Sequence, residues 1–132
     1  MNKELETMDS IGFGGMKLIQ GNGFRYGVDA VLLAGFTAGE TGGRGMKWRR
    51  TPRILELGCG NGIVSLILSH KIPESIMVGV EIQPKEAERA CRNARLNHLE
   101  ERIHIREADV ASLGETALPE KFNAVVTNPP YF

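Results

Sequence analysis

The sequence predicts an α/β fold in which a doubly wound parallel β-sheet is built from alternating strands and helices. From residue 53 onward, short apolar runs alternate with segments whose apolar residues recur at helical spacing. Strands that alternate with helices are joined by right-handed crossovers, which make the sheet parallel and place helices on both of its faces. The 132 residues, 42% apolar and 24% charged, are typical of one soluble globular protein.

Residues 1–52 are predicted to form an N-terminal unit with a β-hairpin, a helix and a basic loop. Two short apolar runs, 16–20 and 24–26, flank a Gly-Asn-Gly turn, as in a hairpin. Asp29 is predicted to cap a short apolar helix over 30–36.

Charge is balanced over the whole chain but not along it. Residues 1–53 carry eight Lys/Arg and five Asp/Glu, a net +3, and residues 54–132 carry eight and eleven, a net −3. Only the N-terminal part therefore favours phosphate. The loop after the predicted helix is either an RNA-binding patch or, as we favour, a solvated linker. Its basic and aromatic residues include Arg44, Lys47, Trp48, Arg49 and Arg50.

Composition argues against several other classes of protein. No apolar run approaches the ~20 residues of a membrane span, and the acidic N-terminus has no apolar core of a signal peptide. Cys59 and Cys91 do not suggest a disulfide framework, so a reduced, cytoplasmic setting is expected. No Cys/His cluster has metal-ligand spacing, so no metal is expected.

Residues 53–132 are predicted to supply the parallel sheet. One helix is expected over 63–70, and another from Pro84, where alanines recur at helical spacing opposite charged residues. The strands are expected over 54–57, 77–81, 103–106 and 122–127.

A glycine-rich turn, residues 58–62, follows the first of these strands. Glycines at such a turn let a ligand lie against bare backbone near a helix N-terminus. The spacing departs from the dinucleotide fingerprint, whose sixth position here is Ile63, and no Lys-Ser/Thr pair forms a P-loop.

Two acidic residues follow the next two strands. The carboxylate of Glu81 can accept hydrogen bonds from both hydroxyls of a ribose, and that of Asp109 can accept a hydrogen bond from an adenine amino group. Either acid alone is more simply a strand-end or capping residue. Together with the glycine turn they favour a nucleoside site, and a ligand with a positively charged tail, such as S-adenosylmethionine, suits its acidic lining.

The last residues are TNPPYF, 127–132. With ILELGCGNG, VGVE and Ala108-Asp109-Val110, this ending resembles class I S-adenosylmethionine-dependent methyltransferases of the amino-methylating branch, which have a Rossmann-like fold. The stretch KLIQGNGFRYGVDAVLLAGF resembles bacterial tRNA (adenine-N6)-methyltransferases that modify adenosine 37 of a valine tRNA. The resemblance covers about residues 12–132. Within it, the glycine turn is specific only to the class, whereas NPPY is specific to methylation of a planar, amide-like nitrogen.

The resemblance implies transfer of a methyl group from S-adenosylmethionine to the N6 nitrogen of adenine in tRNA. That nitrogen is not basic, because its lone pair is delocalised into the ring. If the side-chain oxygen of Asn128 and the carbonyl of Pro129 accept hydrogen bonds from its two N–H groups, the N6 nitrogen can become pyramidal. Its lone pair can then point at the methyl group. Pro130 helps to stiffen the loop, and Tyr131 can stack on the unstacked base.

The resemblance also implies a set of site residues. The catalytic residues would be Asn128, Pro129, Pro130 and Tyr131. Tyr26 and Asp29 would lie near the methionine end of the cofactor or near the target base, although for Asp29 a plain helix cap is equally favoured. Cofactor contacts would come from Glu56, Gly58, Cys59, Gly60, Glu81, Ile82, Asp109, Val110 and Asn128.

The end of the chain leaves alternatives open. A class I fold orders seven strands 3-2-1-4-5-7-6, and this chain supplies the four ordered 3-2-1-4, so a C-terminally truncated chain is expected. Its fourth strand, 122–127, would then leave an apolar edge open to self-association. A methyltransferase of protein glutamine or DNA adenine would use the same chemistry. A third reading is a non-catalytic domain that binds S-adenosylmethionine or nothing.

Overall fold

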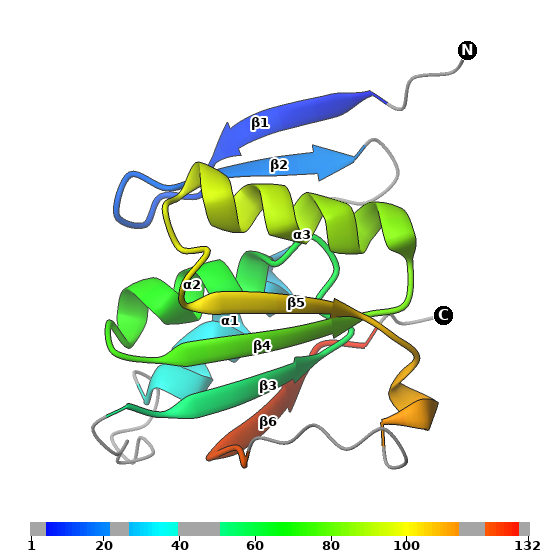
Figure 1. Cartoon of the computed structure of the whole chain (residues 1–132). Coiled ribbons are helices and arrows are strands. Elements are labelled where there is room, and N and C mark those ends of the chain that lie inside the picture. Colours follow the sequence, from blue (N-terminus) through cyan, green and yellow to red (C-terminus); the bar gives the residue numbers. More distant parts are fainter. Residues whose placement is uncertain (1–4, 22–26, 40–50, 114–120, 130–132) are drawn as a thin grey trace.

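The structure, a computed structural model, describes residues 5–21, 27–39, 51–113 and 121–129. The structure has an antiparallel pair, β1 (Glu6–Ser10) and β2 (Lys17–Gly21), and a parallel sheet of four strands, with helix α3 (Pro84–Leu96) between them (Figure 1). The helices are α1 (Val28–Ala38), α2 (Ile63–Lys71), α3 (Pro84–Leu96) and the short 3₁₀ helix η1 (Val110–Ser112). The parallel strands are β3 (Arg53–Leu57), β4 (Ile76–Glu81), β5 (Ile103–Glu107) and β6 (Ala124–Thr127).

The parallel sheet has the strand order β5-β4-β3-β6, which confirms the predicted α/β fold and the expected order 3-2-1-4. The chain steps from β3 to β4 to β5 in one direction and then returns to place β6 on the other side of β3. In open α/β sheets, ligands bind outside the carboxyl ends of the strands where the order reverses. The fold therefore predicts a ligand site at the carboxyl end of β3.

The main core lies on one face of the sheet. Ile54, Met77 and Ile103, from three adjacent strands, pack in one buried cluster with residues of α1, α2 and α3. The N-terminal elements belong to this cluster as well, because β2 contributes Leu18, which is fully buried. A smaller cluster on the opposite face holds Leu55, with Val78 and Val80 of β4.

The predicted hairpin is present, but its strands are not the expected ones. The structure pairs β2 with β1, from Glu6↔Gly21 to Ser10↔Lys17, whereas the sequence reading paired 16–20 with 24–26. Residues 24–26 lie outside the described part of the chain. The sequence of β1, ETMDS, is polar because its side chains are mostly exposed, and an apolar pattern therefore gave no signal for it.

Asp29 is not the cap of its helix. The N-cap of α1 is Gly27, and Asp29 lies in the first helical turn without a capping hydrogen bond from its side chain. The chain enters the helix earlier than predicted, since Val28, an exposed apolar residue, is already helical. A carboxylate in the first turn is still favourable, because it faces the positive end of the helix dipole.

Strand β6 ends the sheet within the described residues, where it pairs only with β3. Its central residue, Val125, is 57% exposed. An edge strand with an exposed apolar residue can pair with another chain.

Candidate functional site

The candidate site is built on one row of residues across the sheet. Leu57 of β3 is in register with Val80 of β4 and with Thr127 of β6. The hydroxyl of Thr127 also donates to the carbonyl oxygen of Leu57 at 3.0 Å, which ties the two strand ends together. The next residues along these three strands are Gly58, Glu81 and Asn128, so three of the predicted site residues emerge side by side.

The glycine turn follows β3, and its backbone is not covered by side chains at Gly58 and Gly60. Gly58 and Gly60 have φ values of 67° and 54°, the left-handed region in which other residues are strained. A Cβ atom added at either position would meet no atom within 4 Å. The two glycines are therefore required by conformation rather than by crowding, and open space borders the backbone of the turn.

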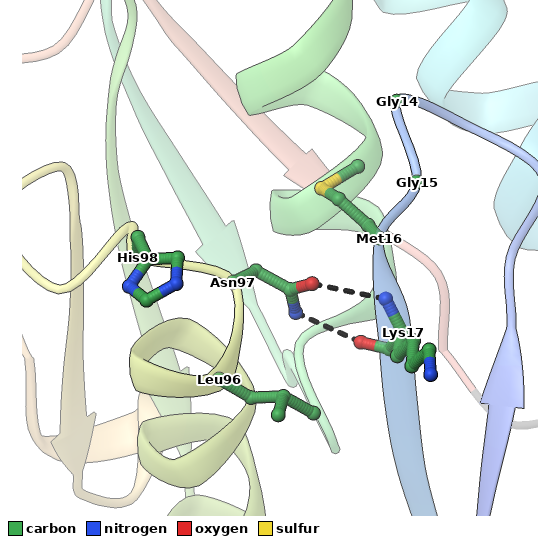
Figure 2. A pocket seen from close by; sticks show the side chains of 7 residues that line it. All are labelled: Gly14, Gly15, Met16, Lys17, Leu96, Asn97 and His98. Carbon is green, nitrogen blue, oxygen red and sulfur yellow. Dashed lines mark hydrogen bonds between the residues drawn. The ribbon is translucent and has the colours of Figure 1, made fainter.

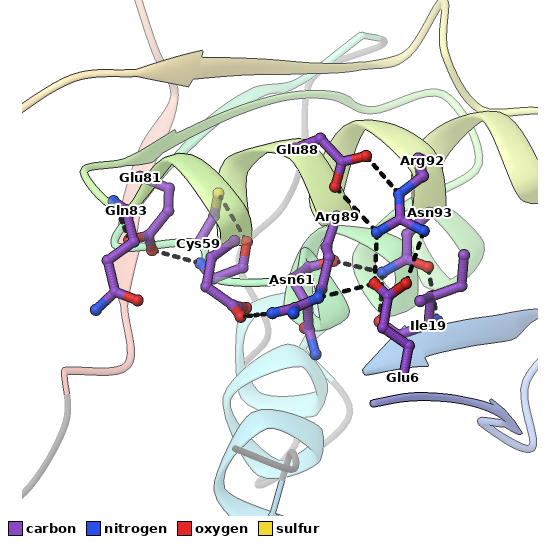
Figure 3. Close-up of polar contacts among 12 residues, drawn as sticks. Glu6, Ile19, Cys59, Asn61, Glu81, Gln83, Glu88, Arg89, Arg92 and Asn93 are labelled. Atoms are coloured by element: carbon purple, nitrogen blue, oxygen red, sulfur yellow. Dashed lines mark hydrogen bonds and ion pairs between the residues drawn. The ribbon is translucent and has the colours of Figure 1, made fainter. Parts of the chain in front are cut away.

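Glu81 fixes this turn to the start of α3. Its side chain is buried, with one carboxylate oxygen accepting from the N–H of Gly60 at 2.8 Å and the other from the N–H of Gln83 at 2.9 Å (Figure 3). A carboxylate has about four acceptor positions. The two oxygens of Glu81 can therefore hold the turn and still accept from the hydroxyls of a ligand.

Glu56 lies beneath the same turn and is only 2% exposed. The hydroxyl of Ser65, in the first turn of α2, donates to its carboxyl group at 2.8 Å. Burial raises the pKa of Glu56 to about 8, against the opposing effect of the Ser65 hydrogen bond and with a further contribution from the charge of Glu81. Glu56 is consequently protonated at neutral pH in this structure.

Cys59 contributes its backbone to the turn, whereas its side chain packs against the sheet. A Cβ atom at Gly79 of β4 would lie 2.8 Å from the Cys59 sulfur, so the missing side chain at position 79 makes room for the thiol. Burial raises the pKa of the thiol, so it is not a nucleophile.

The strand ends beside Glu81 carry the other predicted contacts. Asp109 is exposed and caps η1 by accepting from the N–H of Ala111 at 3.0 Å. Two exposed apolar residues follow β4 and β5: Ile82 comes directly after β4, and Val110 is the first residue of η1. Two exposed apolar side chains flanking a capping carboxylate can cover the face of a flat ring while the carboxylate meets its edge.

The substrate half of the predicted site is described only in part. Asn128 is half-buried and Pro129 is exposed. Pro130, Tyr131 and Tyr26 lie outside the described residues, as do the basic residues of 44–50. Asp29 is exposed, and no hydrogen bond in the described part of the structure joins it to the glycine turn.

Sequence reasoning missed three polar residues around the turn. Ser65 holds Glu56, and Asn93 of α3 donates to the carbonyl oxygen of Asn61 at 2.8 Å. The side-chain nitrogen of Asn61 is buried and finds no hydrogen-bond partner among the described residues. The sequence did contain a signal for them, namely a polar residue on an otherwise apolar helix face. A Ser or Asn that is buried at such a position needs a hydrogen-bond partner.

We also looked for other kinds of site among the described residues. The described residues include no group of three or more His, Cys, Asp and Glu placed to hold a metal ion. No helix in the described ranges is long and apolar enough to cross a membrane. A cavity of about 320 Å³ lies at the C-terminal end of α3 and contains none of the predicted site residues (Figure 2). Its lining is Gly14, Gly15, Met16, Lys17, Leu96, Asn97 and His98.

Known proteins resemble this chain in sequence. The family model described as "Methyltransferase small domain" matches residues 44–132. The tRNA1(Val) (adenine(37)-N6)-methyltransferase of Yersinia enterocolitica is 33% identical over 109 residues, 82% of this chain and 39% of that protein. The corresponding protein of Yersinia pestis is also 33% identical, over 82% of this chain and 40% of its own length. The chain thus spans about two fifths of the length of the curated relatives it matches.

Solved structures share the fold. TYW2 of P. horikoshii, in complex with MeSAdo, superposes with a TM-score of 0.62 at 15% identity, over 83% of this chain and 38% of that one. An RNA methyltransferase from Salinibacter ruber, in complex with S-adenosyl-L-homocysteine, has a TM-score of 0.50 at 24% identity, over 58% and 46%. The sheet is therefore that of a Rossmann-like, class I methyltransferase. Since the matched residues include the glycine turn, Glu81 and Asn128, the chain belongs to the methyltransferase small domain family.

Proposed function

We propose that this chain carries the cofactor half, and the NPPY motif, of an enzyme that methylates the N6 nitrogen of adenine in tRNA with S-adenosylmethionine. The main observation behind this proposal is the register of the strand ends. Gly58, Glu81 and Asn128 each come directly after one of three residues that are in register on β3, β4 and β6. This row supports the proposal because it brings an open backbone, a buried carboxylate and the first residue of NPPY to one place. The names of the Yersinia relatives support tRNA as the substrate.

The residues present fit S-adenosylmethionine. The open backbone at Gly58 and Gly60 leaves room for the methionine part, and no Cβ atom blocks it. Glu81 has acceptor capacity for ribose hydroxyls. Asp109, flanked by Ile82 and Val110, suits an adenine ring. When bound, the cofactor supplies an electrophilic methyl group on a sulfonium sulfur.

The protein's part in the reaction is alignment of the target nitrogen. The side-chain oxygen of Asn128 and the main-chain carbonyl oxygen of Pro129 would accept hydrogen bonds from the two N–H groups of the target nitrogen. These acceptors favour the pyramidal nitrogen and the positive charge that develops on it. The bond between Thr127 and Leu57 holds Asn128 next to the turn, so that its side-chain oxygen can orient the target amino group. After methyl transfer the positively charged nitrogen loses one of its protons to solvent.

Replacing Glu81 by alanine is expected to weaken the binding of S-adenosylmethionine about 100-fold, because one or two charge-assisted hydrogen bonds and the support of Gly60 are lost. Isothermal titration calorimetry on the folded variant measures this. Glu74→Ala is the matched control, since Glu74 is exposed and lies just before β4, at its opposite end. Equal affinities for the two variants would contradict the role of Glu81.

Transfer of a labelled methyl group distinguishes the proposed function from its alternatives. The protein is incubated with labelled S-adenosylmethionine and, in parallel, with unmodified tRNA, adenine-containing DNA and a glutamine-bearing protein. Label recovered as N6-methyladenosine in tRNA is the expected result. Label found in the DNA or in the protein would show that this molecule, and not tRNA, is the substrate. Binding of S-adenosylmethionine without any methyl transfer would identify a non-catalytic domain. A folded sample that binds no S-adenosylmethionine would reject the whole proposal.

The proposal includes self-association through the edge of β6 and a cytoplasmic location. Val125, exposed on this edge strand, supports the first, and the free thiols of Cys59 and Cys91 support the second. Val125→Lys is expected to lower the sedimentation coefficient at high protein concentration, because a charge on an edge strand opposes pairing. A wild-type protein that sediments as a monomer at every concentration would refute self-association.

A further inference from the structure

Asn93 of α3 and Asn97, the C-cap residue of the same helix, complete the open edge of the N-terminal hairpin. The side-chain oxygen of Asn93 accepts from the N–H of Ile19 at 2.7 Å, and its nitrogen donates to the carbonyl oxygen of Ile19 at 3.0 Å. Asn97 makes the same pair of bonds with Lys17, at 2.9 and 2.8 Å (Figure 2). The asparagines are four residues apart on one helix face, and Lys17 and Ile19 are two apart on one strand edge. Each side-chain amide thus replaces the peptide group of a neighbouring strand.

The two asparagines differ in their third hydrogen bond. Asn93, which is fully buried, donates to the carbonyl oxygen of Asn61 in the glycine turn at 2.8 Å (Figure 3). Asn97, the C-cap of α3, instead donates to the carbonyl oxygen of Asn93 in the last turn of that helix, also at 2.8 Å. Of this pair, therefore, Asn93 is the one that joins the hairpin to the glycine turn.

Helix α3 supports the turn from one side along its length. Glu81 binds the N–H groups of both Gly60 and Gln83, the latter being the N-cap of α3. Further along, a Cβ atom at Gly62 would lie 3.5 Å from that of Ala90. At Gly58 and Gly60, by contrast, an added Cβ atom would meet no atom within 4 Å. The peptide between Asn61 and Gly62 is consequently oriented by α3, and Asn93 is the side chain that binds its carbonyl oxygen.

The hairpin is also held on α3 through its first strand. Arg89 and Arg92 of α3 both form ion pairs with Glu6 of β1. Arg89 is almost fully buried in this contact. The hairpin, α3 and the glycine turn are thus connected by specific polar contacts rather than by apolar packing alone.

We propose that Asn93 is a positioning residue of the cofactor site, which couples the docking of the β1–β2 hairpin to the conformation of the glycine turn. This inference rests on the proposed function in one respect, the binding of S-adenosylmethionine at the turn. The hairpin then forms part of the cofactor-binding unit. Because coupling between two sites is reciprocal, cofactor at the turn stabilises the hairpin contact of Asn93 as well.

Asn93→Ala and Asn97→Ala form a matched pair of variants. Both lose two hydrogen bonds to the edge of β2, but only Asn93→Ala releases the carbonyl of Asn61. We expect the dissociation constant of S-adenosylhomocysteine, measured by calorimetry on folded protein, to rise about tenfold in Asn93→Ala and less than about twofold in Asn97→Ala. Equal changes in the two variants would overturn the proposal, because a role confined to docking the hairpin would affect both alike.

Amide hydrogen exchange on the wild-type chain tests the coupling without any variant. S-adenosylhomocysteine is expected to slow exchange at the N–H of Ile19, which bonds to Asn93, more than at the N–H of Lys17, which bonds to Asn97. In the absence of ligand, the N–H of Gly62, which donates to the carbonyl of Cys59 at 2.9 Å, should exchange faster in Asn93→Ala than in Asn97→Ala. Equal protection of Ile19 and Lys17 by the ligand would also overturn the proposal.

Different results would refute the proposed function and the positioning role of Asn93. If folded wild-type protein binds no S-adenosylhomocysteine, the proposed function fails, while exchange at Gly62 in the two variants still decides whether Asn93 orients the turn. If the wild type binds and the two variants behave alike, Asn93 has no positioning role and the proposed function stands.

Discussion

Asn128→Ala is expected to reduce methyl transfer to tRNA by a factor of about 100 to 1,000, the typical loss when one preorganised hydrogen-bonding group is removed from a reacting centre. The variant should still bind S-adenosylmethionine, because the glycine turn, Glu81 and Asp109 are unchanged. The expected signature is therefore a loss of single-turnover rate with little change in the dissociation constant of the cofactor. Single-turnover transfer of labelled methyl, combined with calorimetry, measures both quantities.

Asn123→Ala provides the control within the same strand. Asn123 immediately precedes β6, and its side-chain oxygen accepts from the N–H of Arg53 at 2.8 Å, at the end of the sheet opposite to Asn128. Removing it destabilises the pairing of β3 with β6 but touches no site residue. If Asn128→Ala and Asn123→Ala slow the transfer equally, Asn128 contributes only to the stability of β6 and the assigned role in alignment is wrong.

The sheet and the arrangement of its strand ends could be predicted from sequence because both depend on local patterns. The apolar runs of β3 and β4 are buried on both faces, so they stand out as continuous, and glycines and acids mark where they end. The carboxyl ends of parallel strands necessarily meet at one edge. Recognising Gly58, Glu81 and Asn128 as strand-end residues was therefore enough to predict that they lie together.

The N-terminal contacts could not be predicted in the same way, because they depend on residues far apart in the chain. Strand β1 is polar, and its partner β2 is stabilised on its other edge by side chains of α3, 74 and 80 positions further along. In the sequence, Asn93 and Asn97 are simply polar positions of an amphipathic helix. Only the fold shows that Asn93 is fully buried and that its amide takes the place of a strand.

The protonation of Glu56 also escaped prediction. The resemblance implies only that Glu56 contacts the cofactor, and its place in the ligand site stays a prediction. The structure buries its carboxyl group against the hydroxyl of Ser65, and the pKa rises from an ordinary 4.5 to about 8. A single sequence does not reveal this shift, because it depends on how closely α2 covers the end of β3.

Glu56→Gln is expected to make the folded chain more stable than wild type at alkaline pH. The folded state binds the Glu56 proton more tightly than the unfolded state, because the pKa is raised from 4.5 to about 8 on folding. The stabilisation from the protonated carboxyl is therefore complete below pH 4.5 and is lost as pH rises through about 8. Glutamine stays neutral at every pH and keeps the oxygen that accepts from Ser65.

Urea unfolding from about pH 5 to about pH 9 measures the effect as the difference in unfolding free energy between variant and wild type. That difference should grow in favour of the variant by up to about 1.4 kcal/mol per pH unit and level off above the folded-state pKa. Glu74→Gln, the same change at an exposed site, controls for the loss of a carboxyl group as such. A pH-independent difference for Glu56→Gln would contradict the raised pKa. If the variant is more stable and also binds S-adenosylmethionine more weakly, the buried acid lowers stability in the service of the ligand site, as functional residues commonly do.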